Sequence, residues 1–202
     1  MPGPDPAPTR AAILAAAAEL LEQGGPEALT LRSVGAAAGV SRQAPYRHFA
    51  EKAALEHALR SRSMTELAAR IRDEANHGDK RTRLLRGCMA YLDHAFDQPH
   101  HYLLIFGDTP VEHPDPEVAA AADDAMGSIY EMVQAAQGRG DLAQGSTRDV
   151  ATIVWVMLHG MAQLQITRHL QEPRTVEGRD GVEKLLRLAL ASLRPARTQA
   201  RA

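Results

Sequence analysis

The abundance of small helix-forming side chains constrains the fold of this chain more than any other feature. Alanine fills 36 of the 202 positions, against four tyrosines, three phenylalanines and one tryptophan. Because alanine has the highest helix propensity, the interior must be built from many small contacts between good helix formers. No segment has the pattern of a credible strand, so we predict an all-α protein.

Glycine and proline residues divide the chain into about nine helical segments. Between these breaks, apolar residues recur three and four positions apart, which is the spacing of one helix face. Thr30 and Ser41 each precede a short segment and are residue types that cap helix N-termini. The predicted helices cover roughly residues 9–23, 31–38, 42–48, 51–76, 84–97, 101–106, 118–137, 147–170 and 182–194.

The charge balance and the cysteine count exclude several classes of protein. With 23 basic and 25 acidic residues, the formal net charge of −2 rules out a diffuse basic surface, so any nucleic-acid site must be local. The single cysteine, Cys88, excludes an internal disulfide framework and a multi-cysteine zinc site. No apolar run approaches the ~20 residues that span a bilayer, and the N-terminus lacks the basic start of a secretory signal. We therefore expect a cytoplasmic protein with no membrane segment.

Residues 30–52 are the most informative segment for function. From Thr30 to Ala50 the segment contains three arginines and no acid, so it carries a local charge of +3 in a net negative chain. Two short helices joined by a turn at Gly39 follow a longer one. This is the order of a helix-turn-helix module, whose second helix enters the major groove of DNA.

The side chains of this segment are suited to both bases and phosphates. Arginine pairs with guanine, glutamine with adenine, and an alanine methyl can contact thymine. Hydroxyl, imidazole and cationic groups bind phosphate oxygens. The predicted DNA-binding residues are Thr30, Arg32, Ser33, Ser41, Arg42, Gln43, Ala44, Tyr46, Arg47, His48 and Lys52.

Four short matches in this region follow one known pattern: Ile13–Ala17, Ala36–Ser41, Tyr46–Phe49 and Lys52. Through them residues 9–60 resemble the DNA-binding domain of the tetracycline-repressor-like (TetR/AcrR) transcriptional regulators. The chain departs from the family at Ala44-Pro45, where Thr-Leu or a similar pair is common. It departs again at Ala50, where the family often has Ser or Asp as the cap of the next helix, so we expect a slightly weaker cap.

The segment Trp155–Gly160 is similar to the Trp-x-x-x-His-Gly signature of one class of TetR-like regulatory domains. In that class this helix usually joins the last helix in a four-helix dimer interface. The resemblance implies a homodimer, with interface residues Ile153, Met157, Gly160, Leu164, Leu186 and Leu190. Trp155 and His159 either belong to this seam or line a ligand pocket.

Methionine, aromatic and acidic residues on the middle helices are candidates for that ligand pocket. Ordinary core packing is the alternative for each one taken singly. As a set they predict an apolar pocket with few polar anchors. The candidates are Met89, Asp93, Phe96, Tyr102, Phe106, Met126, Tyr130, Trp155 and His159.

The predicted domain organisation follows from these segments. Alternate prolines disfavour a regular helix before Thr9, so residues 1–8 are expected to be a disordered arm. Residues 9–50 form the helix-turn-helix domain, and residues 51–195 the linker helix and the ligand-binding and dimerisation domain. Residues 196–202 are expected to be a disordered tail.

No catalytic or metal-binding motif stands out in the sequence. It has no nucleophile elbow, phosphate loop or dinucleotide fingerprint, and the histidines lack metal-ligand spacing. We therefore expect no enzyme activity, no metal and no cofactor.

The expected function is that of a ligand-responsive transcription regulator. Its partners would be a pseudo-palindromic double-stranded DNA operator, bound by a homodimeric repressor, and a small, mostly apolar effector that releases the DNA. One alternative is a helical small-molecule-binding protein or enzyme with a vestigial DNA module. A purely structural dimerisation protein is another, and the acid-free segment argues against both.

Overall fold

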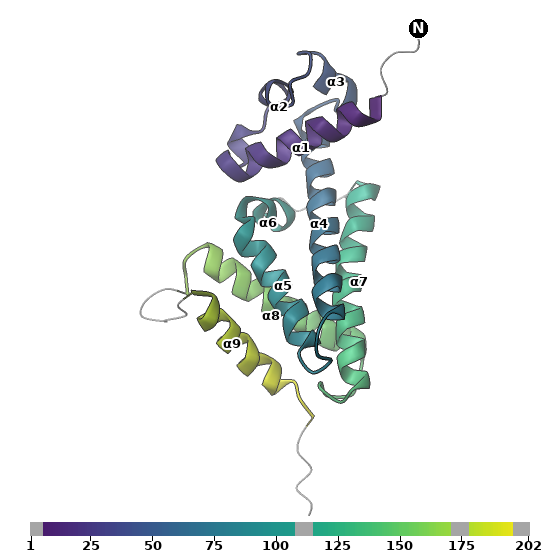
Figure 1. The fold of residues 1–202 in the computed structure, drawn as a ribbon, viewed down its shortest axis with the longest axis vertical. Coiled ribbons are helices and arrows are strands. Elements are labelled where there is room, and N and C mark those ends of the chain that lie inside the picture. The colour runs from purple at the N-terminus through teal and green to yellow at the C-terminus, as the bar shows by residue number, and fades with distance from the viewer. Residues whose placement is uncertain (1–5, 108–114, 171–177, 196–202) are drawn as a thin grey trace, which may run out of the picture. The chain divides into compact units, whose positions relative to one another are not determined.

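The computed structural model describes residues 6–107, 115–170 and 178–195, and every regular element in them is helical. Figure 1 shows the helices in chain order. The all-α prediction is confirmed. The elements are α1 (Pro6–Gly24), η1 (Pro26–Ala28), α2 (Leu31–Ala37), α3 (Ala44–His48), α4 (Lys52–Asn76), α5 (Arg83–Asp97), α6 (Pro99–Phe106), α7 (Pro116–Gly138), α8 (Thr147–Ile166) and α9 (Gly178–Ser192).

Three predicted helix ends need correction. Helix α1 begins at Pro6 rather than Thr9, because the first turn of a helix needs no hydrogen bond from the amide that proline lacks. Helix α8 ends at Ile166 rather than near residue 170. Helix α4 begins at Lys52, so the residue before it is Glu51 and not Ala50. Residues 1–5 of the predicted arm, and the whole predicted tail, lie outside the described residues.

The chain divides into two compact units. Unit 1 takes its described residues from 1–65 and 98–123, and unit 2 from 66–97 and 124–202. Unit 1 therefore contains the predicted 9–50 domain together with the first part of α4 and the whole of α6. Unit 2 contains α5, α8 and α9 with the remaining parts of α4 and α7.

Unit 1 has one apolar cluster that joins α1, α2, α4 and α6. Its buried members are Ile13, Ala17, Leu21, Leu29, Leu31, Val34, Phe49, Leu55, Ala58, Leu59 and Leu104. Helix α1 packs against α2, α3 and α6 (Figure 1). Because α6 supplies a residue to this cluster, α6 is part of the core of unit 1.

A buried histidine on α6 adds polar ties to the same core. His101 Nε2 lies 3.1 Å from the carbonyl oxygen of Ala18 on α1, and His101 Nδ1 lies 2.8 Å from Ser63 Oγ on α4. A carbonyl only accepts, so Nε2 donates to it, and Nδ1 shares the other hydrogen bond with the serine hydroxyl. The ring therefore links three helices with both nitrogens satisfied.

In unit 2, α5 packs against α8 and α9 (Figure 1). Nine of its fifteen residues are buried, including Tyr91 and Leu92. Helix α9 buries Val182, Leu186 and Leu190, which recur every four positions on one face. No helix in the described parts of the chain has the length and apolar character needed to cross a membrane.

Helices α2 and α3 approach each other at a glycine. A Cβ added to Gly35 would lie 2.8 Å from the ring carbon Cγ of Pro45, closer than real Cβ contacts. Both residues are buried, and a proline ring has little freedom to move aside. The absence of a side chain at Gly35 therefore sets how closely α3 packs on α2.

We predict that Gly35→Ala lowers the free energy of unfolding by about 1–3 kcal/mol, the usual cost of overpacking a well-filled core. Thermal and urea unfolding of the full chain would measure the change. Gly138→Ala is the control, because a Cβ at Gly138 meets no atom within 4 Å. Equal stability of the two variants would show that the α2–α3 contact adjusts without cost.

Candidate functional site

The N-terminus of α2 is fixed by a reciprocal cap. Thr30 Oγ1 accepts a hydrogen bond from the amide of Ser33 at 3.0 Å, and Ser33 Oγ accepts one from the amide of Thr30 at 3.1 Å. Ser33 Oγ also donates to the carbonyl of Ala28 at 2.7 Å. The predicted cap at Thr30 is confirmed, and both hydroxyls, predicted to contact DNA, have structural partners here.

The turn after α2 depends on Gly39. Its φ of 65° lies in the left-handed region, where a side chain is disfavoured. Its amide donates to Ala36 at 3.2 Å, and the amide of Val40 donates to Gly35 at 3.1 Å. This pair of bonds is the Schellman arrangement that ends helices, and it confirms the predicted break.

The predicted start of the third helix was wrong. Helix α3 begins at Ala44 rather than Arg42, and Ser41 is not its cap. A helix capped by Ser41 would need its first hydrogen bond from the amide of residue 45, and Pro45 has none. The carbonyl of Ser41 instead accepts from the amide of Ala44 at 2.9 Å.

Helix α3 and the turn before it expose most of the predicted contact residues. Tyr46 is 56% exposed. Exposed with it are Ser41, Arg42, Gln43 and Arg47, while Ala44 and His48 are half-buried. Pro45 is the buried member that packs toward α2.

The positive charge of this surface is not neutralised by the parts of the chain that the structure describes. Within the described residues, Arg32, Arg42 and Arg47 have no acidic partner. Three exposed guanidinium groups are therefore available to an external anion, as predicted from the acid-free sequence.

Two other cations near α3 differ from these arginines. Lys52 Nζ donates to the carbonyl of Pro26 at 3.0 Å and lies 3.3 Å from Glu56 Oε1, so it already has partners. Arg10 on α1 lies over the ring of Phe49, with its guanidinium carbon 5.4 Å from the ring centre. Arg10 adds a cation beside α3 that the sequence reasoning missed, since nothing local marks a contact 39 positions away.

These features define a helix-turn-helix module of the DNA-binding type: three helices in one core, a glycine turn, and an exposed basic segment at the second helix of the motif. Two family models match the chain accordingly. The model of bacterial regulatory proteins of the tetR family matches residues 13–59, and the tetracyclin repressor-like C-terminal domain matches residues 84–193. The chain belongs to the tetR family of transcription regulators.

Solved structures agree with this fold. A protein of unknown function from Rhodococcus sp. RHA1 is 25% identical, with a TM-score of 0.79 over 93% of this chain and 96% of the other. A TetR-family regulator from Pectobacterium atrosepticum is 21% identical, with a TM-score of 0.74 over 95% and 96%. The regulator PfmR from Thermus thermophilus is 19% identical, with a TM-score of 0.62 over 94% and 99%. No curated protein matches the sequence.

The residues predicted to bind a ligand fall in both units. Tyr102 and Phe106 belong to unit 1, where their ring centres are 4.8 Å apart. The unit 2 members are Met89, Asp93, Phe96, Met126, Tyr130, Trp155 and His159. The rings of Trp155 and His159 are 6.0 Å apart, and burial lowers the pKa of His159, which favours a neutral ring.

Two of these residues, Met89 and Asp93, line a pocket of about 340 Å³ in unit 2. Charged side chains from α4, α5 and α9 surround an apolar strip formed by Leu85, Met89 and Ala90. Asp93 accepts two hydrogen bonds from Arg179, at 2.9 and 2.8 Å, which raise the pKa of the arginine. The pocket is more polar than the sequence led us to expect.

The residues predicted for a dimer interface divide into two groups. On α8, Ile153 is 50% and Leu164 44% exposed, and Met157 and Gly160 are half-buried. On α9, Leu186 and Leu190 are buried inside unit 2 and offer no surface to a partner. The large apolar residue that α9 exposes is Leu188. It lies two positions from Leu186 and two from Leu190, and therefore on the other side of the helix.

No group of three or more metal-ligating side chains occurs within the described residues.

We predict that Thr30→Ala lowers the free energy of unfolding by about 1 kcal/mol, because the amide of Ser33 loses its acceptor. Thr30→Ser keeps the hydroxyl and should retain most of the wild-type stability. Urea unfolding of both variants would measure the difference. If the two variants were equally destabilised, the methyl group and not the cap would be responsible.

Proposed function

We propose that this chain is a ligand-responsive repressor that binds a pseudo-palindromic operator as a homodimer. The observation that carries the proposal is the exposed segment from Ser41 to Arg47, whose arginines have no acidic partner in the described residues. Guanidinium groups without an acidic partner, on a recognition helix and in the turn before it, are suited to guanine edges and to phosphates.

Each exposed side chain has a proposed role. Arg42 and Gln43 precede the first turn of α3, the end of a recognition helix that meets the bases, so we assign base reading to them. Tyr46 and Arg47 lie further along and are assigned to phosphates. Arg32 and Arg10 add charge to the same contact. Thr30, Ser33 and Lys52 keep a proposed phosphate role, which they would share with the internal bonds described above.

The proposed dimer uses the apolar surface of α8 and α9. Val156 is 57% exposed and Leu188 63%, and Ile153 and Leu164 extend the exposed apolar surface of α8. Large apolar side chains that are exposed in groups mark interaction sites more often than isolated ones do. Two copies would place two recognition helices one DNA turn apart, about 34–36 Å, or a multiple of it.

The proposed effector site is the 340 Å³ pocket of unit 2, whose volume reaches the range of small-molecule sites. An effector that binds only one of two conformations shifts the protein toward that conformation. By linkage, the effector changes operator affinity by the same factor by which the operator changes effector affinity. Because charged side chains surround this pocket, we favour an effector with polar groups around an apolar body.

The proposal includes no catalytic step and no cofactor. The exposed basic segment is a feature that a DNA-binding regulator needs. A regulator acts in the compartment that holds the chromosome, which is consistent with the cytoplasmic location expected from the sequence.

We predict that the wild-type protein enriches an inverted repeat from fragmented genomic DNA. Arg42→Ala should reduce the preference for that sequence over random DNA, because a bidentate base contact is worth about 1–3 kcal/mol. Arg47→Ala should weaken binding to both DNAs alike and reduce the salt dependence by about one ion. Fluorescence anisotropy at several salt concentrations would measure both effects.

Arg148→Ala removes the same charge from an exposed position of α8 and serves as the control for the DNA experiment. If the wild type enriched no sequence even at low salt, the repressor proposal would be wrong. If Arg42→Ala affected specific and random DNA equally, Arg42 would belong with the phosphate contacts.

We predict that Val156→Glu combined with Leu188→Glu converts the dimer to a monomer, because two charges would be buried in an apolar interface. Light scattering after size-exclusion chromatography would report the mass. Gln134→Glu adds a charge at an exposed position of α7 and should leave the dimer intact. A double variant that remains dimeric would place the interface elsewhere.

A further inference from the structure

A cavity of about 150 Å³ adjoins the 340 Å³ pocket of unit 2. Thr82, Leu85 and Arg187 line both cavities. Helix α9 packs beside α5 and runs in the opposite direction (Figure 1), so that Asp93 near the end of α5 bonds Arg179 near the start of α9. The two cavities are therefore parts of one groove between these helices, which we call the α5–α9 groove.

An apolar strip on α5 follows this groove. Leu85, Met89 and Ala90 line the larger cavity, and Leu84 and Leu85 line the smaller one. From residue 82 to residue 89 the groove follows α5 over about 10 Å, the length of seven helical residues. The strip therefore provides an elongated surface for an unbranched hydrocarbon chain.

The arginines of the larger cavity are neutralised by acidic side chains of the same unit. The pairs are Arg70–Asp97 at 2.7 Å, Arg86–Glu74 at 2.6 Å, Arg179–Asp93 at 2.8 Å and Arg187–Glu183 at 2.6 Å. Because each of these cations has an anionic partner, this part of the groove offers no excess charge to a ligand.

The smaller cavity differs because two of its arginines have no acidic partner. Arg81 and Arg194 line it, both are exposed, and neither pairs with a carboxylate in the parts of the chain that the structure describes. The carboxylate that lines this cavity, Asp141, pairs with Arg139 at 2.8 Å. The first turn of α5 contains no acidic residue. This end of the groove therefore carries uncompensated positive charge that solvent and ligands can reach.

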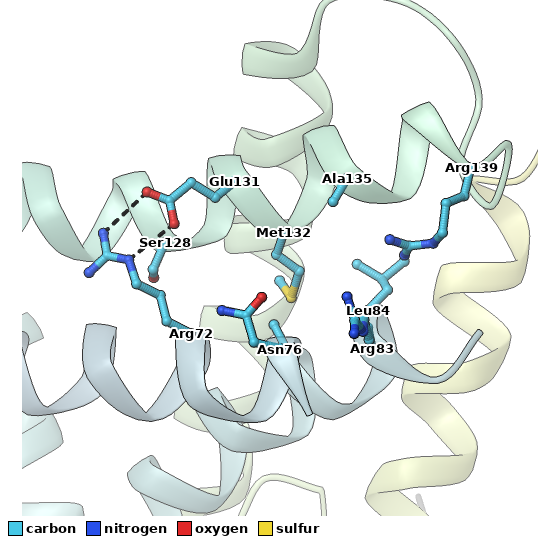
Figure 2. Close-up of a pocket in the computed structure, with 10 residues that line it drawn as sticks. Arg72, Asn76, Arg83, Leu84, Ser128, Glu131, Met132, Ala135 and Arg139 are labelled. Carbon is cyan, nitrogen blue, oxygen red and sulfur yellow. Dashed lines mark hydrogen bonds and ion pairs between the residues drawn. The ribbon is translucent and has the colours of Figure 1, made fainter. Parts of the chain in front are cut away.

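A third cavity on the other side of the first turn of α5, of about 80 Å³, lacks this property (Figure 2). Figure 2 shows Arg72 joined to Glu131 there, with Nε donating at 3.1 Å. Arg139 pairs with Asp141, and the Nε of Arg83 is buried. Accessible unpaired guanidinium groups thus distinguish the α5–α9 groove from this neighbour.

The charged end and the apolar strip together indicate the chemistry of the ligand. Guanidinium groups bind carboxylates through paired N–H donors. Exposed ion pairs contribute little affinity by themselves, so a small anion without an apolar part would be held weakly. A hydrocarbon chain on the strip would add affinity, about fourfold for each methylene group that becomes buried. A carboxylate that carries an unbranched chain combines both parts.

We propose that the α5–α9 groove binds an unbranched acyl carboxylate, with the carboxylate at Arg81 and Arg194 and the chain along Leu85 and Met89. The groove includes the proposed effector pocket, so a role of this ligand in releasing DNA rests on the proposed function. The binding of the carboxylate does not depend on DNA.

Calorimetric titration of the full-length protein with sodium octanoate tests the proposal. We expect saturable binding of one octanoate per chain. Butyrate has the same head group and a shorter chain, and it should bind at least tenfold more weakly because fewer methylene groups are buried. Octylamine has the same chain length and the opposite charge, and it should also bind at least tenfold more weakly.

The double variant Arg81→Gln with Arg194→Gln should weaken octanoate binding at least fivefold and remove the preference for octanoate over octylamine. Both side chains are exposed and lack an acidic partner, so the variant should keep the wild-type melting temperature. Arg148→Gln is the control, because it removes an exposed positive charge that does not line the groove and should leave octanoate binding unchanged.

An absence of saturable octanoate binding would overturn the proposal, as would equal binding of octylamine or unchanged binding in the double variant. Binding of butyrate as tight as that of octanoate would overturn the placement of the chain. Operator binding measured by anisotropy with and without octanoate separates this proposal from the proposed function. If octanoate bound to the groove without weakening operator binding, the carboxylate site would stand and the groove would not be the effector site.

Discussion

The proposed DNA-binding surface depends on the left-handed turn at Gly39. That turn ends α2 and lets the chain reverse direction, which brings Pro45 against the bare face of Gly35. With Pro45 buried, the neighbouring side chains of Arg42 and Tyr46 are left exposed. A side chain at Gly39 would have to adopt a disfavoured φ, and the resulting strain would destabilise the turn that positions α3.

Apolar and polar contacts tie helix α6 to the other helices of unit 1. Leu104 fills the apolar cluster, Arg60 Nε donates to the Leu104 carbonyl at 3.0 Å, and His101 bridges α1 and α4. Displacing α6 would leave a buried imidazole without its two partners, a loss of about 1–3 kcal/mol for each group left unsatisfied. A conformational change that moves α6 must therefore also rearrange the contacts of the helix-turn-helix module.

Local features of this fold could be read from the sequence, and long-range ones could not. The cap at Thr30 and the break at Gly39 depend on residues within five positions, so their patterns were visible. The start of α3 was misjudged because a capping serine was given more weight than the missing amide of Pro45. The ties of His101 to residues 38 and 83 positions away leave no trace in local spacing.

The apolar faces illustrate the same limit. The four-residue spacing of Leu186 and Leu190 correctly marked a buried face of α9, but periodicity does not say what covers it. In the structure that face belongs to the core of unit 2, and Leu188 is the residue left exposed. Periodicity identifies a surface that must be buried, and only the packing of the other helices decides whether a second chain is needed.

The arginines show why net charge predicts so little about function. Arg72 is neutralised by two carboxylates, Arg42 is exposed without an acidic partner, and Arg83 has a buried nitrogen without an acceptor. All three contribute equally to the formal charge of −2. Solvent compensates the charge of Arg42 until a stronger anion arrives, whereas water does not reach the Nε of Arg83. An exposed unpaired cation is therefore consistent with a polyanion that binds and leaves.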